Sequence, residues 1–338
     1  MKPVATFVIA VASLAAIAVV SLVSGAVSIS SYGVVHWLIG LESGSLTETE
    51  RTILLQLRLP RVITACLVGG SLGIAGVGFQ SLFRNPLADP YVIGASSGAG
   101  LGVTLAVVLG FQTSLMGLSG TAFSAMLGCL LAVTMVFAIG SLGRGSSVLS
   151  LLLAGVAVSS MINAIASLVM YWNDDSVVVI LAWLMGSLAG NDWSVVLATS
   201  LSSFLGFLIL WSMSRPMDVF LLGDVTSESL GLDLFRFRLL LVTGSSIATA
   251  AAVASAGIIG FVGLIAPHIA RRMVGPRHAR LLPMSACVGA AIMMVADVAA
   301  RTIVAPAELP VGILTALLGS PFFLFLLKSR DESRDGTA

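Results

Sequence analysis

The sequence has few charged residues and almost no lysine. Only 10% of its 338 residues are charged, whereas roughly a quarter are charged in an ordinary soluble domain. A soluble fold is therefore excluded. The net charge is +1, and the few cations are dispersed along the chain instead of forming a basic stripe. No nucleic-acid surface is indicated, and partners must be of another kind.

Side chains that catalyse reactions or bind metals are also scarce. Three cysteines, Cys66, Cys129 and Cys287, sit singly inside apolar runs, which indicates buried packing residues and neither a disulfide framework nor a metal site. The histidines do not converge with cysteines or carboxylates, and no G-x-S-x-G nucleophile motif occurs. A phosphate-binding loop usually needs a lysine after its glycines, yet the only lysines are Lys2 and Lys328. We therefore expect no catalytic residue, metal or cofactor in this chain.

Apolar residues, in contrast, are abundant and grouped into long runs. They make up 57% of the chain, and the mean hydropathy is +1.06. Crossing a hydrocarbon core of about 30 Å takes roughly 20 helical residues. We therefore predict an all-α membrane protein, a polytopic bundle that forms one domain over residues 1–338. Ten spans are expected near residues 4–29, 61–83, 91–111, 115–140, 148–170, 193–213, 239–256, 257–274, 282–300 and 309–328.

Three segments of this pattern allow more than one interpretation. The run at 4–29 could pass for a signal peptide, but it is longer than the usual h-region, so we expect an uncleaved first helix. Segment 176–190 is apolar but short, which predicts a helix that dips in from one face without crossing. Only Gly257 and Gly260 indicate a turn between the seventh and eighth spans.

Basic residues are distributed unevenly between the two sides of the predicted bundle. With ten spans and a cytoplasmic N-terminus, thirteen lysines and arginines fall inside and four outside. Such a bias sets the orientation of membrane proteins. Both ends, including a tail at 329–338, are therefore expected in the cytoplasm. The four outside residues are Arg51, Arg58, Arg61 and Arg301.

Many of the 35 glycines cluster within the expected spans. Gly73 and Gly76 lie in the second span, and Gly94, Gly98 and Gly102 form two overlapping G-x-x-x-G steps. This spacing lets helix backbones approach closely where lipid supplies no hydrophobic drive for association. These glycines are therefore interpreted as helix-packing residues.

Arg58, Arg61 and Arg301, called the outer arginines below, lie outside against the positive-inside trend. They could snorkel at helix ends, or pair with Glu48, Glu50 or Glu308. The alternative is a cationic rim that docks an acidic soluble partner, because a guanidinium binds carboxylate bidentately and charge pairs fix the register of an interface.

The inner loop 214–238 is the longest expected cytoplasmic connection. Asp224 suits an N-cap and Gly231 a C-terminal stop, so the loop is predicted to contain a short helix. Its apolar residues could pack as an ordinary loop helix. They could instead bind a protein partner, because an exposed apolar face is otherwise costly. These residues are Leu221, Leu222, Val225 and Leu230.

Carboxylates are missing from the middle of every expected span, and Asp297 and Glu308 lie near outer ends. Proton-coupled carriers usually need such groups within the membrane. An ion-coupled secondary carrier of a small molecule is therefore disfavoured, although it stays the alternative. The lack of a catalytic cluster likewise disfavours a membrane enzyme.

A set of motifs over residues 50–328 resembles the FecCD-type permeases for iron-siderophores, haem and vitamin B12. The motifs follow one another at the expected spacing. They are Arg58-Leu-Pro-Arg61, Gly73-Ile-Ala-Gly76, Gln80, Arg84-Asn85-Pro86-Leu87-Ala88-Asp89-Pro90, Gly94-Ala95-Ser96-Ser97-Gly98, Leu222-Gly223-Asp224, Gly260-Phe261-Val262-Gly263, Ala296-Asp297 and Glu308-Leu309-Pro310.

This resemblance implies a BtuC-like permease of a type II ATP-binding-cassette importer that works by alternating access. The implied assembly is a homodimer, or a pair of similar halves, in lipid, with two separate ATPase subunits that use ATP and a periplasmic substrate-binding protein. The outer arginines would dock the binding protein. Helix packing or the path would involve Gly73, Gly76, Gln80, Asn85, Pro86, Gly94 and Gly98. The coupling helix would contain Leu221, Leu222, Gly223, Asp224, Val225, Ser227, Glu228, Leu230 and Gly231. The substrate stays open, with an iron-siderophore ranked before haem and cobalamin.

Overall fold

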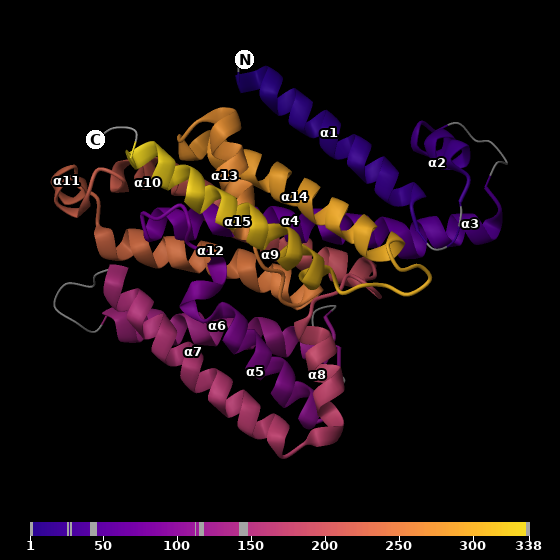
Figure 1. The fold of residues 1–338 in the computed structure, drawn as a ribbon, viewed down its shortest axis with the longest axis horizontal. Helices are drawn as coiled ribbons and strands as arrows, with labels where there is room; N and C mark the ends of the chain where they lie inside the picture. The colour runs from indigo at the N-terminus through magenta and orange to yellow at the C-terminus, as the bar shows by residue number, and fades with distance from the viewer. Residues whose placement is uncertain are drawn as a thin grey trace.

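The chain forms a bundle of helices in the computed structural model, which describes residues 3–335 except 26, 28, 41–45, 112, 115–117 and 142–147 (Figure 1). Its elements are α1 (Pro3–Val23), α2 (Ser31–Leu38), α3 (Glu48–Thr52), a π-helix (Ile53–Arg58), α4 (Leu59–Leu82), a 3-10 helix (Pro90–Ile93), α5 (Ala95–Val108), α6 (Gly120–Ser141), α7 (Val148–Tyr171), a 3-10 helix (Asp174–Ser176), α8 (Val177–Leu184), α9 (Trp193–Ser212), α10 (Ser214–Phe220), α11 (Asp224–Ser229), α12 (Leu234–Ala256), α13 (Val262–Val274), α14 (His278–Thr302) and α15 (Val311–Asp335). Within these residues no strand element occurs, which confirms the all-α prediction.

The ten predicted spans correspond to α1, α4, α5, α6, α7, α9, α12, α13, α14 and α15. Among the described residues, seven helices are long and apolar enough to cross a membrane, and α5 and the Val311–Leu324 part of α15 are shorter apolar helices. The chain is therefore a multi-pass membrane protein, whereas ten complete crossings stay a prediction. α1 ends at Val23, earlier than expected, and α15 continues as a helix into the predicted tail. Lys2 lies outside the described residues.

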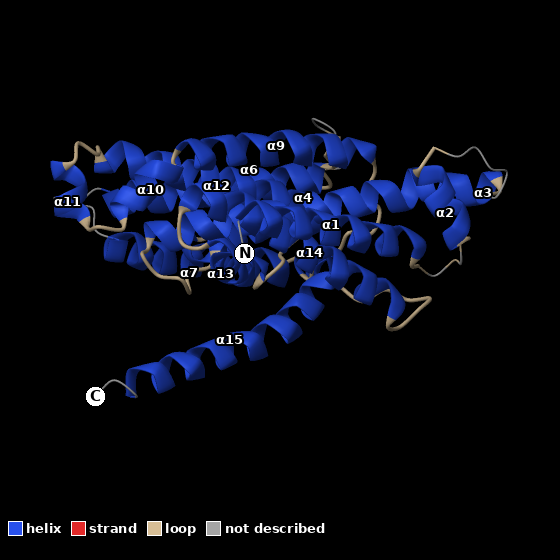
Figure 2. Cartoon of the chain, turned by 90° about the horizontal axis from the view of Figure 1, so that it is seen from above, coloured by secondary structure: helices blue, strands red, loops and turns tan. Residues whose placement is uncertain are grey.

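α4 occupies the centre of the bundle, where α9, α12, α13 and α14 pack around it. The helices α5 to α7 form a second group, which joins the first through α12 and α6 (Figure 1). α8 has eight residues and is too short to cross, as predicted for this segment. The C-terminal part of α15 leaves the body of the bundle (Figure 2).

The turn between α12 and α13 confirms the break expected near Gly257. Gly257 has φ +72°, and a Cβ there would lie 2.5 Å from the carbonyl oxygen of Trp183. Non-helical backbone in a membrane protein needs internal hydrogen-bond partners. The Ser187 N–H donates to the Ala256 carbonyl at 2.9 Å, and the Val311 N–H donates to the Gly186 carbonyl at 3.1 Å. Three irregular segments thus provide hydrogen-bond partners for one another's backbone groups where α8, α12 and α15 meet.

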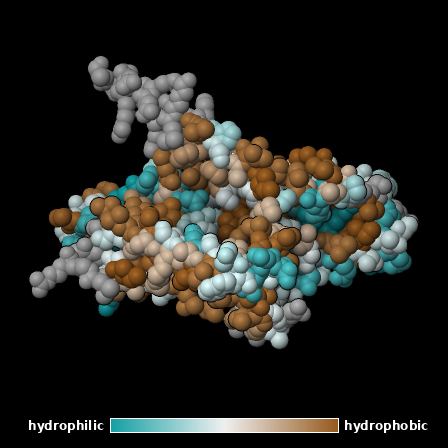
Figure 3. Space-filling view, turned by 60° about the horizontal axis from the view of Figure 1, so that its bottom comes forward, coloured by the Kyte–Doolittle hydropathy of each residue, from teal (hydrophilic) through white to brown (hydrophobic). Residues whose placement is uncertain are grey.

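Large apolar side chains cover much of the outer surface. Figure 3 shows hydrophobic residues over much of one face, with hydrophilic patches mainly toward its two ends. Leu149, Leu153 and Val156 on α7, and Leu201 and Phe204 on α9, are each more than 60% exposed. Exposure on this scale fits contact with lipid or with another membrane chain.

The predicted glycine contacts are present between central helices. A Cβ at Gly73 would lie 2.3 Å from the Ser285 carbonyl oxygen of α14, and one at Gly76 would lie 1.8 Å from the Gly263 carbonyl oxygen of α13. On the other side, a Cβ at Gly98 would lie 2.2 Å from the carbonyl oxygen of Gly128 on α6. These glycines therefore set the closest approach of helix backbones in both groups.

A pair of glycine substitutions on α4 tests these contacts. Gly73→Ala is expected to destabilise the protein by about 1–3 kcal/mol because a backbone carbonyl must move. In the control Gly70→Ala the nearest atom to the new Cβ is 3.6 Å away, so the helix propensity of alanine should leave stability unchanged or slightly higher. Thermal unfolding in detergent measures both. Equal unfolding midpoints for the two variants would contradict the packing role.

Candidate functional site

The inner loop forms two short helices, α10 and α11, which lie at one end of the molecule (Figure 1). The predicted N-cap is wrong by one residue: Gly223, with φ +104°, caps α11, and Asp224 is its first helical residue. The predicted stop is confirmed, because Gly231 has φ +86°. The Gly231 N–H donates to the Glu228 carbonyl at 2.9 Å, and the Leu232 N–H to the Ser227 carbonyl at 3.0 Å, which is the Schellman arrangement.

The loop helix leaves an apolar surface without cover in this chain. The exposed fractions are 47% for Leu221, 61% for Leu222, 83% for Val225 and 63% for Leu230. Ser227 lies on the opposite, buried side, where its hydroxyl donates to the Gly223 carbonyl at 2.6 Å. We call the four exposed residues the coupling surface. Their exposure favours a protein partner over an ordinary packed loop helix.

Two of the outer arginines are buried within the chain. Arg58 is 5% exposed, and its guanidinium donates to the carbonyl oxygens of Leu22, at 2.8 Å, and Val23, at 2.6 Å. Arg301 is also 5% exposed and donates to the Ser24 carbonyl at 2.9 Å. Both therefore cap the C-terminal end of α1, whose last carbonyls would otherwise lack helical partners.

The third outer arginine belongs to an ion cluster between α4 and α14. Arg61 binds Glu308 bidentately, with both N–O distances at 2.9 Å, and binds Asp297 at 2.9 Å. Asp297 is 0% exposed and pairs with Arg301 at 3.0 Å. The expected pairing with Glu308 is therefore present. Docking of a partner by the outer arginines stays a prediction, and the structure gives Arg58 and Arg301 an internal role besides it.

A cavity of about 350 Å³ opens beside the outer arginines. Its walls include Gln56 of the π-helix and Asn191 and Asp192 from the loop before α9. The π-helix contributes to this geometry, because the Leu59 N–H donates to Leu54, five residues back. Such insertions shift the register of a helix and are frequent at functional sites.

Gln80, Asn85 and Pro86, which are expected in helix packing or the path, lie at or just beyond the C-terminal end of α4. The Gln80 amide donates to the Leu264 carbonyl at 3.3 Å, and the Asn85 side chain accepts from the Leu87 N–H at 3.0 Å. Gln80, Asn85 and Pro86 line one small cavity of about 80 Å³ together with Leu221 of the coupling surface. Gly94, with φ +86°, instead starts α5. The structure therefore brings three of these residues close to the loop helix.

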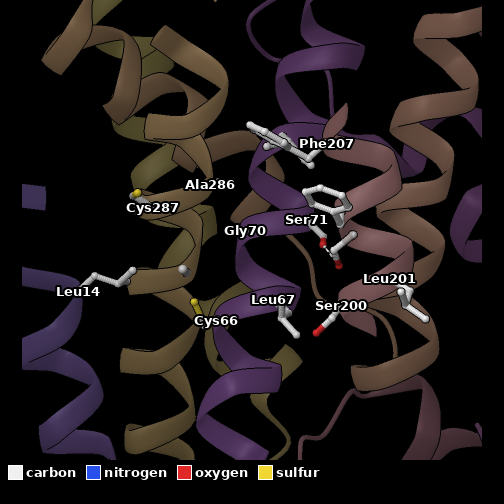
Figure 4. Close-up of a pocket in the computed structure, with 14 residues that line it drawn as sticks. Leu14, Cys66, Leu67, Gly70, Ser71, Ser200, Leu201, Phe207, Ala286 and Cys287 are labelled. Carbon is white, nitrogen blue, oxygen red and sulfur yellow. Dashed lines mark hydrogen bonds between the residues drawn. The ribbon is translucent and has the colours of Figure 1, made fainter. Parts of the chain in front are cut away.

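A larger cavity of about 570 Å³ lies between α1, α4, α9 and α14 (Figure 4). Its lining is apolar apart from serines such as Ser71, whose hydroxyl donates to Ser203 at 2.6 Å. Cys66 and Cys287 line this same cavity and are only partly buried, whereas Cys129 is buried as predicted. Among the described residues no group of three or more metal-ligating side chains forms a site.

Asp89 carries a half-buried carboxyl that the span pattern did not reveal. It accepts from the Tyr91 N–H at 2.8 Å and caps the 3-10 helix Pro90–Ile93. Burial raises the pKa of Asp89 from 3.8 to about 6. Because the folded state holds this proton more tightly than the unfolded state, the stability it contributes is complete below pH 3.8 and is lost as pH rises through 6.

Asp89→Asn is expected to remove this pH dependence. Asparagine keeps the N-cap acceptor and does not ionise, so the variant should exceed wild type in stability above pH 6 by at most about 3 kcal/mol. Unfolding midpoints at pH 5 and pH 7.5 measure the difference. Asp192 is the control, because hydrogen bonds from the Ser194 hydroxyl and the Val195 N–H lower its pKa. A difference in unfolding midpoint between wild type and Asp89→Asn that is the same at both pH values would refute the raised pKa of Asp89.

Three further residues join the loop helix to the bundle and were not recognised as a site. Arg84 follows α4, Arg238 lies in α12, and Phe220 ends α10. In the sequence Arg84 is part of a motif and one of the basic residues expected inside, and no periodicity marks Arg238 or Phe220. The one available signal was the presence of arginines beside the loop.

Comparison with known proteins assigns the family. The FecCD transport family matches residues 13–329. The hemin transport system permease protein HmuU of Yersinia pestis is 40% identical over 286 residues, which cover 84% of this chain and 85% of that protein. The Fe(3+)-citrate import system permease protein YfmE of Bacillus subtilis is 37% identical over 327 residues, 97% of this chain and 96% of that protein. A solved inward-facing structure assigned to the metal-chelate type ABC transporters superposes with a TM-score of 0.84 at 35% identity, covering 97% of this chain and 100% of that one.

Proposed function

The chain belongs to the FecCD transport family, and from this premise we propose that it is the permease subunit of an ATP-binding-cassette importer. Its relatives are permease subunits, so ATP is hydrolysed by a separate ATPase subunit. The observation that carries the proposal is the coupling surface: four large apolar side chains, each at least 47% exposed, on the capped helix α11 and the residues that flank it at one end of the bundle. A surface of this kind fits an apolar cleft on a partner protein.

The proposed orientation places the coupling surface in the cytoplasm and the outer arginines outside. The two sites lie at opposite ends of α4, because Arg58 precedes its first residue and Arg84 follows its end. Both termini are then cytoplasmic and the membrane is the bacterial inner membrane, in agreement with the distribution of basic residues. Two ATPase subunits and a second copy of this chain complete the proposed assembly, with a periplasmic binding protein near the outer arginines.

The proposed cargo is an iron chelate, carried by alternating access. The relative that covers 97% of this chain imports Fe(3+)-citrate, and the hemin permease makes haem the second candidate. Cobalamin stays the third candidate. The cavity of about 570 Å³ is too apolar for a hydrophilic chelate, so its expected occupants are lipid acyl chains.

Reconstitution tests the proposal. The chain is purified with its cognate ATPase and binding protein and placed in proteoliposomes. Uptake of ferric siderophore, haem or cobalamin should require both the loaded binding protein and ATP. Uptake that persists without ATP and follows an ion gradient would instead support a secondary carrier. A chain that captures no ATPase would overturn the proposal outright.

A further inference from the structure

One carboxylate ties the loop helix to two core helices. Asp224, the first residue of α11, forms ion pairs with Arg84, which follows α4, and with Arg238 of α12, the latter at 2.8 Å. The Arg84 Nε also donates to the Phe220 carbonyl at 3.0 Å, and its guanidinium lies 3.9 Å from the centre of the Phe220 ring. Arg238 is 6% exposed at its side chain and lies over the same ring at 5.8 Å. We call these four residues the Asp224 cluster.

Asp224 differs from the residues of the coupling surface because its side chain contacts other residues of this chain. Leu222 and Val225, on either side of it in sequence, are 61% and 83% exposed. The Asp224 carboxylate is instead shared by two guanidiniums of the bundle, and charge-assisted hydrogen bonds of this kind are the strong ones. The Asp224 carboxylate therefore binds the helices, although its side chain is 43% exposed, while Leu222 and Val225 are free to contact a partner.

The backbone at Arg84 gives an independent observation. Arg84 has φ +47°, in a region that glycine favours. Its N–H donates to the Ser81 carbonyl at 3.2 Å, and the Asn85 N–H donates to the Gln80 carbonyl at 3.1 Å, so Arg84 occupies the position that glycine usually holds after a helix. Gly231 holds the same position after α11. An arginine in this conformation is strained, and strain of this kind is kept where the side chain is needed.

We infer that the Asp224 cluster is the link through which the loop helix moves α4 and α12. This inference rests on the proposed function, in which an ATPase contacts the coupling surface. A displacement of α11 pulls on Asp224, and its two ion pairs carry the displacement to the inner end of α4 and to the first turns of α12. Since α4 is the central helix of the bundle, this route reaches the packed core directly. Asp224, Arg84 and Arg238 are thus positioning residues that act through helices and do not touch the cargo.

Asp224→Asn and Arg84→Gly test the link from its two sides. Asparagine loses the charge on the loop helix, while glycine removes the guanidinium and relieves the backbone strain at φ +47°. Arg84→Gly, which lies outside the loop helix, is expected to bind the ATPase as wild type does, with unchanged hydrolysis in the absence of binding protein. Stimulation of hydrolysis by loaded binding protein, and uptake, should fall by about tenfold, within the usual range of coupling between sites.

The control is Asp233→Asn in the same loop. Asp233 is 53% exposed at its side chain and caps α12 by accepting from the Arg236 N–H, a role that asparagine retains. The same change in charge should then leave uptake unaltered. Wild-type uptake in Asp224→Asn and Arg84→Gly would overturn the link. Loss of ATPase binding in Arg84→Gly would overturn it too, since the Asp224 cluster would then hold the ATPase contact itself in place. Failure of the wild-type chain to bind the ATPase would instead contradict the proposed function.

Discussion

Val225→Asp and Leu230→Asp are each expected to abolish ATP-driven uptake by separating the ATPase from the complex. These side chains are 83% and 63% exposed in the isolated chain, so the substitutions cost little in the folding of the permease. In the proposed complex the new carboxylate enters an apolar cleft without a partner, and burying an unpaired charge costs several kcal/mol. A cost of about 3 kcal/mol weakens binding roughly 100-fold.

Co-purification of the ATPase with the permease, followed by uptake in proteoliposomes, measures this result. Val225→Ile and Leu230→Met are the matched controls, because they keep an apolar side chain of similar size at each position. The controls should bind and transport as wild type does. Normal ATPase binding by both aspartate variants would show that energy enters the permease elsewhere.

Asp297→Ala is expected to cause the largest loss of folding stability. Asp297 is 0% exposed and lies between Arg61, at 2.9 Å, and Arg301, at 3.0 Å. Its removal leaves the buried Arg301 and the half-buried Arg61 without their shared counter-charge. Breaking a buried ion pair in this way typically costs about 3–5 kcal/mol. The thermal unfolding midpoint in detergent, and the yield of folded protein, should both fall.

Glu308→Gln is the control for the buried cluster. Glu308 binds the same Arg61, but its side chain is 39% exposed, and exposed ion pairs contribute about 1 kcal/mol or less. The two variants should therefore differ by several kcal/mol although each removes one carboxylate from the same arginine. Equal stability of the two variants would mean that Asp297 is solvated in the folded protein.

The internal contacts of the outer arginines also change how docking can be tested. A substitution such as Arg58→Glu places a carboxylate against the carbonyl oxygens of Leu22 and Val23. It should disturb the end of α1 whether or not a partner docks there. A loss of docking in this variant is therefore informative only if its unfolding midpoint matches that of wild type.

The sequence was sufficient for the features that depend on local pattern. Apolar runs located the ten longer helices, and glycine spacing identified the contacts of Gly73 and Gly98. The glycine at 257 marked the break between α12 and α13, because a positive φ there needs a residue without a Cβ. Exposure of the coupling surface followed from its position in a loop, where no span could bury it.

Features that depend on distant contacts could not be predicted in this way. Arg58 lies in a π-helix that shifts its register. It is buried because carbonyl oxygens 35 and 36 residues away accept hydrogen bonds from its guanidinium. Arg84 adopts a positive φ that no propensity assigns to arginine. The pairing of Asp224 with Arg84 joins residues 140 positions apart, so composition and periodicity carry no trace of it.

The capping of α1 by arginines from two distant helices also constrains the order in which the protein assembles during synthesis. Arg58 emerges 36 residues after Leu22 and can reach the end of α1 early, whereas Arg301 follows Ser21 by 280 residues. At about 5–20 residues per second, the ribosome takes tens of seconds to add that length. For this interval the end of α1 has only one of its two arginines, and its capping is complete only when α14 has entered the membrane.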